Sequence, residues 1–262
     1  MILAFWMGCS TAVDRGEEAL SHDDLVGAER EFRSALESDP ADAQALYGLG
    51  WTFYMAGEQS AANDAFKQLV GAHPESPLGH RGLGSVAAAR GEVPAARKHL
   101  DNALARAPGD PRSLQSLALL DMREGKYDEA LSRLDLILDG EPASAVALQT
   151  RAAVLLRADR PEEALAAADA AVSSATTPRE RATSQLTRAH ALMATSDGRV
   201  GRDNCVDAGA VAAWLGEVDA ELDRAQAAGI HALEVADARR EVRRRRAYLD
   251  ATCPAGAGLG GQ

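Results

Sequence analysis

Three cysteines and six histidines are the residues of this chain best suited to catalysis or metal binding. Their spacing supports neither role, because the histidines are scattered and no two cysteines have the spacing of zinc ligands. The sequence has no H-E-x-x-H motif or phosphate-binding loop, and no G-x-S-x-G or G-x-G-x-x-G motif in a suitable context. The segment from Asp197 to Asp203 lacks the alternating oxygen ligands and the glycine of an EF-hand. We therefore expect a non-enzymatic protein with no catalytic residues, no metal site, no cofactor and no small-molecule substrate.

The charge of the chain limits the classes of partner that it can bind. Its 262 residues carry a net charge of −11, with 46% hydrophobic and 26% charged residues, which is typical of a soluble globular protein. Nucleic acids and anionic membrane surfaces attract basic proteins, so neither is an expected partner of the chain as a whole. No run of eighteen apolar residues is present. The remaining partner class is another protein.

A cluster of aromatic residues offers a candidate binding surface. Tyr47, Trp51, Phe53 and Tyr54 lie within eight positions, although aromatic residues make up only 4% of the sequence. On a helix, Tyr47, Trp51 and Tyr54 share one stripe, whereas Phe53 lies on another face and is expected in the core. Tyrosine and tryptophan provide large rigid contact areas with polar tips. The alternative is that the stripe packs against neighbouring helices.

These aromatic residues lie within a periodic sequence. Alanine, proline and glycine each recur at intervals of 34 residues, in three independent series. The series are Ala28, Ala62, Ala96, Ala130 and Ala164; Pro40, Pro74, Pro108 and Pro142; and Gly57, Gly91 and Gly125. Glycine permits a tight turn, alanine lets two helices approach closely, and proline ends the second helix. The repeating unit is predicted to be a helix–turn–helix.

The periodic pattern resembles that of the tetratricopeptide repeat family, which runs W-x2-L-G-x2-Y, then A-x3-F, then P. Residues 43–76 fit best. The matching positions there are Leu46, Leu49, Gly50, Phe53, Ala62, Phe66 and Pro74. Departures from the pattern gather at both ends, for example Thr176 where proline is expected.

The resemblance implies an all-α fold, a right-handed α-solenoid of about six repeats with a C-terminal capping helix. The expected organisation is a truncated lipoprotein signal segment at 1–8, five repeats over 9–176, an irregular sixth repeat over 177–229, and a capping helix with a Gly-rich tail over 230–262. The chain is expected to be a single solenoid and not two domains.

In this family the first helices of the repeats line a concave groove. The resemblance therefore implies a partner-binding face that continues from the aromatic stripe into the following repeats. Its expected residues are Tyr47, Trp51, Tyr54, Arg81, Arg112, Gln115, Met122, Arg123 and Arg157. Aromatic residues followed by arginines suit an extended or helical segment with apolar anchors and acidic or C-terminal character. The alternative for the arginines is an ordinary solvated surface.

The first residues, "MILAFWMGCSTA", resemble a bacterial lipoprotein signal that ends at Gly8-Cys9-Ser10. Only eight residues precede Cys9 and the basic start of a signal is missing, so the alternative is an apolar segment that packs on the first repeat. If Cys9 carries a lipid, Cys205 and Cys253 remain as an even pair in an oxidising compartment and are expected to form a disulfide. Free buried thiols in a cytosolic protein are the alternative.

Repeats together with a lipid anchor resemble bacterial tetratricopeptide lipoproteins, among them the pilotins of type IV pilus secretins. This likeness implies a scaffold or assembly factor in the bacterial cell envelope, on the outer membrane and facing the periplasm, with a secretin subunit as a possible partner. The membrane contact would be through the lipid anchor only. The alternative is a cytosolic adaptor that regulates a protein complex without an anchor.

Overall fold

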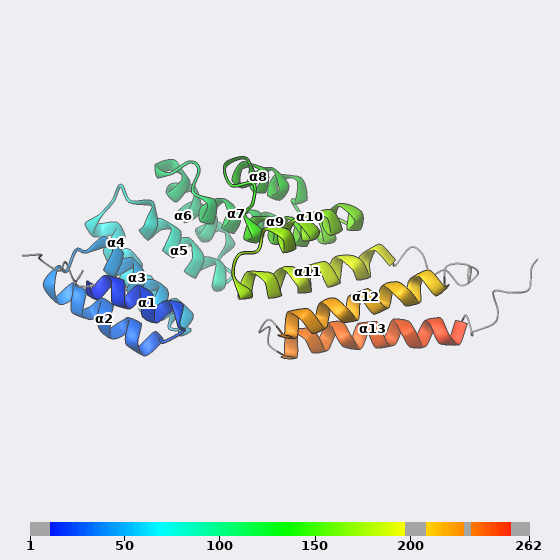
Figure 1. The fold of residues 1–262 in the computed structure, drawn as a ribbon. Helices are drawn as coiled ribbons and strands as arrows, with labels where there is room; N and C mark the ends of the chain where they lie inside the picture. The colour runs from blue at the N-terminus through cyan, green and yellow to red at the C-terminus, as the bar shows by residue number, and fades with distance from the viewer. Residues whose placement is uncertain (1–10, 197–207, 228–231, 253–262) are drawn as a thin grey trace, which may run out of the picture. The chain divides into compact units, whose positions relative to one another are not determined.

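The structure, a computed structural model, describes residues 11–196, 208–227 and 232–252. Within these ranges the chain forms thirteen α-helices and no strand (Figure 1). The predicted all-α fold is confirmed, since consecutive helices pack as pairs in the manner of an α-solenoid. Cys9, Cys205 and Cys253 lie outside the described residues, as does the predicted signal segment.

The chain divides into two compact units, residues 1–120 and 121–262, and each is described by itself. The boundary falls within α7 (Pro111–Arg123). The helices before it are α1 (Ala12–Ser21), α2 (Leu25–Ser38), α3 (Ala43–Met55), α4 (Gln59–Ala72), α5 (Pro77–Ala89) and α6 (Val93–Arg106). The helices after it are α8 (Tyr127–Gly140), α9 (Ala145–Arg157), α10 (Pro161–Ser174), α11 (Pro178–Ser196), α12 (Ala208–Ala227) and α13 (Ala232–Thr252).

The turn inside each repeat depends on one residue with left-handed backbone geometry. Gly57, Gly91 and Gly125 have φ angles of 80°, 75° and 77°, as their spacing predicts. The same position one period earlier and one period later is held by Asp23 (φ 58°) and Asp159 (φ 56°). Aspartate adopts this geometry more readily than most residues with a side chain. The turn therefore recurs at five positions, two of which carry no glycine.

Helix ends follow the local chemistry. Asp24 and Asp42 accept hydrogen bonds from the backbone amides of Gly27 (2.9 Å) and Ala45 (2.8 Å), which caps α2 and α3. The recurring prolines stand two residues after the last residue of α2, α4, α6 and α8. Proline lacks the amide hydrogen that would continue a helix.

Close helix packing holds the first unit together. The alanines of the 34-residue series are fully buried, and so are Phe32 and Phe66. A Cβ atom added to Gly16 or Gly48 would lie 2.7 or 2.3 Å from the Phe32 ring. A Cβ atom added to Gly50 or Gly82 would lie 2.4 or 2.3 Å from the Phe66 ring. Each phenylalanine thus occupies space that glycine leaves open on two successive first helices.

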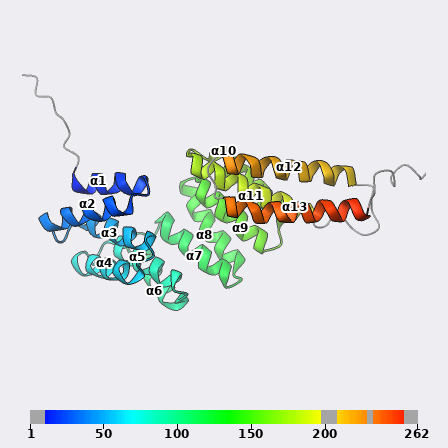
Figure 2. The same ribbon diagram turned by 90° about the horizontal axis from the view of Figure 1, so that it is seen from below.

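The last three helices of the second unit differ from the repeats in length. They span 19, 20 and 21 residues, against 13 or 14 for α2 to α10. α11, α12 and α13 lie side by side (Figures 1 and 2) around buried Leu192, Leu215, Leu222, Val235 and Val242. None of the described helices has the length and apolar character needed to cross a bilayer.

The glycine–phenylalanine contact can be tested with two alanine substitutions. Gly82→Ala forces a methyl group into the Phe66 ring and should lower the free energy of unfolding by about 1–3 kcal/mol. Gly71→Ala is the matched control on α4, where a Cβ meets nothing within 4 Å, and should raise it by about 0.5–1 kcal/mol. Urea unfolding followed by circular dichroism measures both. Equal effects of the two substitutions would contradict this packing.

Candidate protein-binding groove

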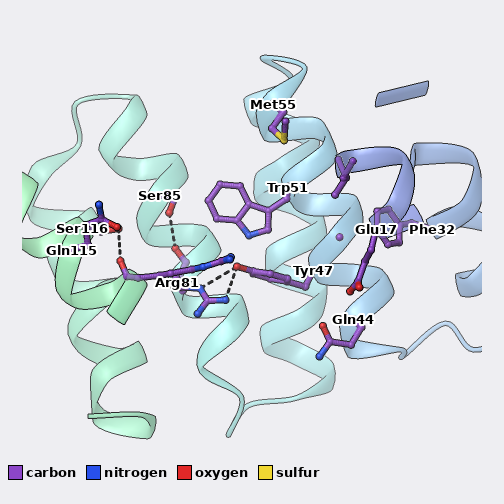
Figure 3. A pocket seen from close by; sticks show the side chains of 13 residues that line it. Glu17, Phe32, Gln44, Tyr47, Trp51, Met55, Arg81, Ser85, Gln115 and Ser116 are labelled. Atoms are coloured by element: carbon purple, nitrogen blue, oxygen red, sulfur yellow. Dashed lines mark hydrogen bonds between the residues drawn. The ribbon is translucent and has the colours of Figure 1, made fainter. Parts of the chain in front are cut away.

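A cavity of about 570 Å³ opens on residues 1–120, and it lies across the first helices of successive repeats (Figure 3). Its lining residues come from α1, α2, α3, α5 and α7. They are Glu17, Leu20, Phe32, Gln44, Tyr47, Gly48, Trp51, Met55, Arg81, Ser85, Arg112, Gln115 and Ser116. We call this cavity the groove.

Aromatic rings form one wall of the groove. Tyr47 and Trp51 meet edge to face with ring centroids 6.0 Å apart, and Trp51 lies 6.0 Å from the buried Phe66 ring. Tyr54 contacts Trp51 edge to face at 5.0 Å but does not itself line the groove. All three side chains of the stripe are half-buried and pack on the repeat core, and Tyr47 and Trp51 also face the cavity. Core packing and a cavity-lining position coexist in the same side chains.

The Trp51 indole carries an unused hydrogen-bond donor. Its Nε1 atom is buried and has no hydrogen-bond partner in the described chain. A buried donor without a partner costs free energy, on the order of 1–3 kcal/mol. A water molecule, or an acceptor that arrives after a small shift of the ring, would remove this cost.

Arg81 connects three successive first helices below the aromatic wall. Its Nε and Nη2 atoms donate hydrogen bonds to the Tyr47 hydroxyl at 3.0 and 2.6 Å (Figure 3), and its Nη1 atom donates to Asp110 at 2.7 Å. Asp110 also accepts from the Ser113 backbone amide (2.9 Å) and hydroxyl (2.5 Å) where α7 begins. Arg81 is only 8% exposed. Its charge is therefore neutralised within the protein, and its role is to hold the Tyr47 ring in place.

Arg112 is the cation of the groove that is available to a partner. It is exposed, and its guanidinium has no ion-pair partner among the described residues. Gln115 and Ser116, both half-buried, lie beside it on α7. Glu17 on α1 is exposed and likewise unpaired within the described chain. The groove thus has polar groups of opposite charge on its first and last helices, with aromatic rings between.

The structure brings together five of the nine predicted groove residues: Tyr47, Trp51, Arg81, Arg112 and Gln115. Met122, Arg123 and Arg157 belong to residues 121–262, so their part in binding stays a prediction. Glu17, Gln44 and Ser116 line the groove but were not predicted from the sequence. The repeat register would have identified Glu17 and Gln44, because they stand 34 and 68 residues before the predicted Trp51 and Arg112.

A second cavity, of about 660 Å³, lies in residues 121–262 and is more polar. Arg188 forms ion pairs there with Asp169 (2.5 Å) and Glu221 (2.8 Å), and Arg224 also pairs with Glu221. Most of its charges satisfy one another, and its walls carry no aromatic ring. The groove is the better candidate for partner binding.

Residues 13–62 and 59–111 each match the family model of the tetratricopeptide repeat. Residues 13–111 therefore belong to the tetratricopeptide repeat family. Tetratricopeptide repeats form a fold that binds other proteins, often through an extended concave surface. No curated protein shows significant sequence similarity to this chain.

Solved structures share the fold at low sequence identity. PilW, a type IV pilus biogenesis factor, is 16% identical with a TM-score of 0.65, over 86% of this chain and 96% of PilW. PilF of Pseudomonas aeruginosa is 16% identical with a TM-score of 0.61, over 88% of this chain and 96% of PilF. A tetratricopeptide repeat protein of Thermus thermophilus is 23% identical with a TM-score of 0.63, over 70% of this chain and 97% of its own.

The structural role of Arg81 leads to a stability prediction. Arg81→Met removes the cation from a buried pair and leaves Asp110 without its counter-charge, so the free energy of unfolding should fall by about 3 kcal/mol. Arg112→Met, in the same groove but exposed and unpaired, should change it by less than about 0.5 kcal/mol. Chemical unfolding of both variants measures the difference. A loss for Arg112→Met as large as that for Arg81→Met would refute the distinction between a structural and a free arginine.

Proposed function

We propose that the protein is a non-enzymatic scaffold whose groove binds an extended segment of another protein. An apolar side chain of the segment packs on Trp51, and a carboxylate of the segment pairs with Arg112. The observation that carries this proposal is that an aromatic wall and an unpaired cation line the same cavity. Aromatic residues and arginine dominate the binding energy of many protein interfaces.

The dimensions of the groove suit a short peptide. Its volume of about 570 Å³ lies in the range of pockets that enclose compact ligands or a few side chains. The groove crosses the first helices of four repeats, and neighbouring helices pack roughly 8–10 Å apart. An extended chain rises about 3.3 Å per residue, so roughly eight residues would cross it.

The polar contacts below the wall favour binding by keeping the site ordered. Arg81 fixes the Tyr47 hydroxyl from below, and Tyr47 supports the edge of the Trp51 ring. A site that is already ordered loses less conformational entropy when its partner binds. Met122, Arg123 and Arg157 remain proposed as additional partner contacts on residues 121–262.

The groove is tested with peptides selected on the wild-type protein from a random phage-displayed library, with affinities then measured by fluorescence anisotropy. Trp51→Ala should weaken the selected peptides by about 30-fold, or ~2 kcal/mol. Phe53→Ala, on the buried face of the same helix, should cost ~3 kcal/mol of stability and leave the affinity of the folded fraction nearly unchanged. If Trp51→Ala lowers the melting temperature as much as Phe53→Ala and leaves affinity intact, the aromatic stripe serves only the core.

The charge contact is tested with the same peptides. Arg112→Glu should weaken peptides that carry an acidic residue at least tenfold and should favour versions in which that residue is replaced by lysine. Arg90→Glu is the matched control, because Arg90 is also exposed but lies outside the groove. An equal effect of the two substitutions would indicate long-range electrostatics and no specific contact at Arg112.

We further propose that the protein acts in the bacterial cell envelope, anchored through Cys9 to the outer membrane and facing the periplasm, where it promotes assembly of a type IV pilus secretin. Two observations support this. The chain shares its fold with nearly the whole length of PilW, and its Gly8-Cys9-Ser10 junction resembles a lipoprotein processing site. The proposal includes a disulfide between Cys205 and Cys253, which an oxidising compartment favours.

The anchor is tested by metabolic labelling with palmitate. Expressed from its natural gene in its own host, the protein should incorporate the label and sediment with membranes, and Cys9→Ser should abolish both. Non-reducing mass spectrometry of the periplasmic protein should find Cys205 joined to Cys253. An unlabelled soluble wild-type protein with two free thiols would instead favour the cytosolic adaptor.

A further inference from the structure

Two histidines face each other across one helix pair, away from the groove. His80 on α5 and His99 on α6 have their Nδ1 atoms 3.4 Å apart. Their ring centroids are separated by 5.6 Å, and the ring planes are inclined by 31°. Both side chains are half-buried, and neither lines the groove.

The separation of these two nitrogen atoms matches a metal-bound pair. Zinc binds histidine nitrogen at about 2.0–2.1 Å and prefers tetrahedral coordination, which places two ligand nitrogens about 3.3–3.4 Å apart. At this distance the two nitrogens share a hydrogen bond, and a metal ion bound to both would take the place of the shared proton. The two rings come from different helices, so the backbone holds the two ligands at this separation.

We propose that His80 and His99 form a two-ligand site for a divalent transition-metal cation such as Zn²⁺. Each imidazole would bind through Nδ1, with its remaining proton on Nε2. Among the described residues no group of three or more His, Cys, Asp or Glu side chains is placed to hold a metal, so the other coordination positions belong to water or to a partner's side chain. The site is independent of peptide binding in the groove.

The electrostatic surroundings agree with this geometry. Burial is the main reason that the pKa of each histidine lies below its ordinary value; Arg106 and His99 add to the effect at His80, and Lys98 adds to it at His99. A lowered pKa favours the neutral imidazole, which is the form that binds a metal ion. The positive charges of Arg106 and Lys98 repel a metal cation, so we expect the site to bind zinc with modest affinity. Cu²⁺, which stands higher in the Irving–Williams order, should bind more tightly than Zn²⁺.

Metal binding would connect α5 to α6. Because the ligands converge only in the folded chain, the metal would bind the native state in preference to the unfolded one. At a free metal concentration of 100 times the dissociation constant, the ratio of folded to unfolded protein should rise about 100-fold.

The experiment is isothermal titration calorimetry with ZnCl₂ on tag-free, full-length protein in which every free thiol has been alkylated, since thiolates would otherwise compete for zinc. His80→Ala and His99→Ala should each weaken the site at least tenfold. His22→Ala, which removes an exposed histidine at the end of α1, is the matched control and should bind as wild type does. Circular dichroism spectra establish that each variant is folded, and His80→Gln replaces His80→Ala if the latter is not.

The second measurement is the thermal midpoint of unfolding with and without zinc, which also depends on His80 and His99. Zinc should raise the thermal midpoint of the alkylated wild-type protein and of His22→Ala, and should leave that of the two variants unchanged. Loss of binding in both variants with retention in the control supports the site. Absence of wild-type binding, or binding that survives either His80→Ala or His99→Ala, would overturn it. Peptide binding in the groove is unaffected by either result.

Discussion

Close approach between neighbouring helices is the constraint on which the first unit depends. Phe32 and Phe66 fit into space that exists only because Gly16, Gly48, Gly50 and Gly82 have no side chain. The ring then fills the gap between two first helices, and a fully buried alanine on the second helix keeps the pair together. Since protein interiors are packed without large voids, this fit determines the spacing of the helices. That spacing in turn determines which side chains meet in the groove.

The groove depends on a second interaction, the buried contact of Arg81 with Tyr47 and Asp110. A buried ion pair contributes little net stability by itself, but removal of one partner leaves an uncompensated charge. Here Asp110 is further satisfied by Ser113, and the Tyr47 ring lies 5.0 Å from the Arg81 guanidinium. These contacts fix one aromatic side chain while leaving Arg112 exposed. The two arginines of the groove thus differ in role: Arg81 holds the structure together, and Arg112 is exposed to a partner.

The periodic positions predicted the fold well, because each rests on a local requirement. The left-handed geometry that a tight turn needs was predicted correctly at Gly57, Gly91 and Gly125. It was not predicted at Asp23 and Asp159, which adopt it without being glycine. Five of the thirteen residues that line the groove were also predictable, among them Tyr47 and Trp51, which share a helix face. The engagement of Arg81 was not, because Asp110 lies 29 residues away outside the pattern and becomes its partner only after folding. The boundary inside α7 leaves no mark on the 34-residue period, and the approach of His80 to His99 follows no sequence motif.

Arg81 has a consequence for how this array can change over generations. Solenoids commonly gain and lose repeats by duplication or deletion of whole repeats, because each repeat contacts only its neighbours. Tyr47 and Arg81 stand one full period apart, and Asp110 belongs to the start of the next repeat. Three successive repeats are thereby joined through the buried guanidinium of Arg81. An insertion or deletion between Tyr47 and Asp110 would leave a buried charge without its partner. We therefore expect gene rearrangements to be rare in this segment and more frequent elsewhere in the repeat array.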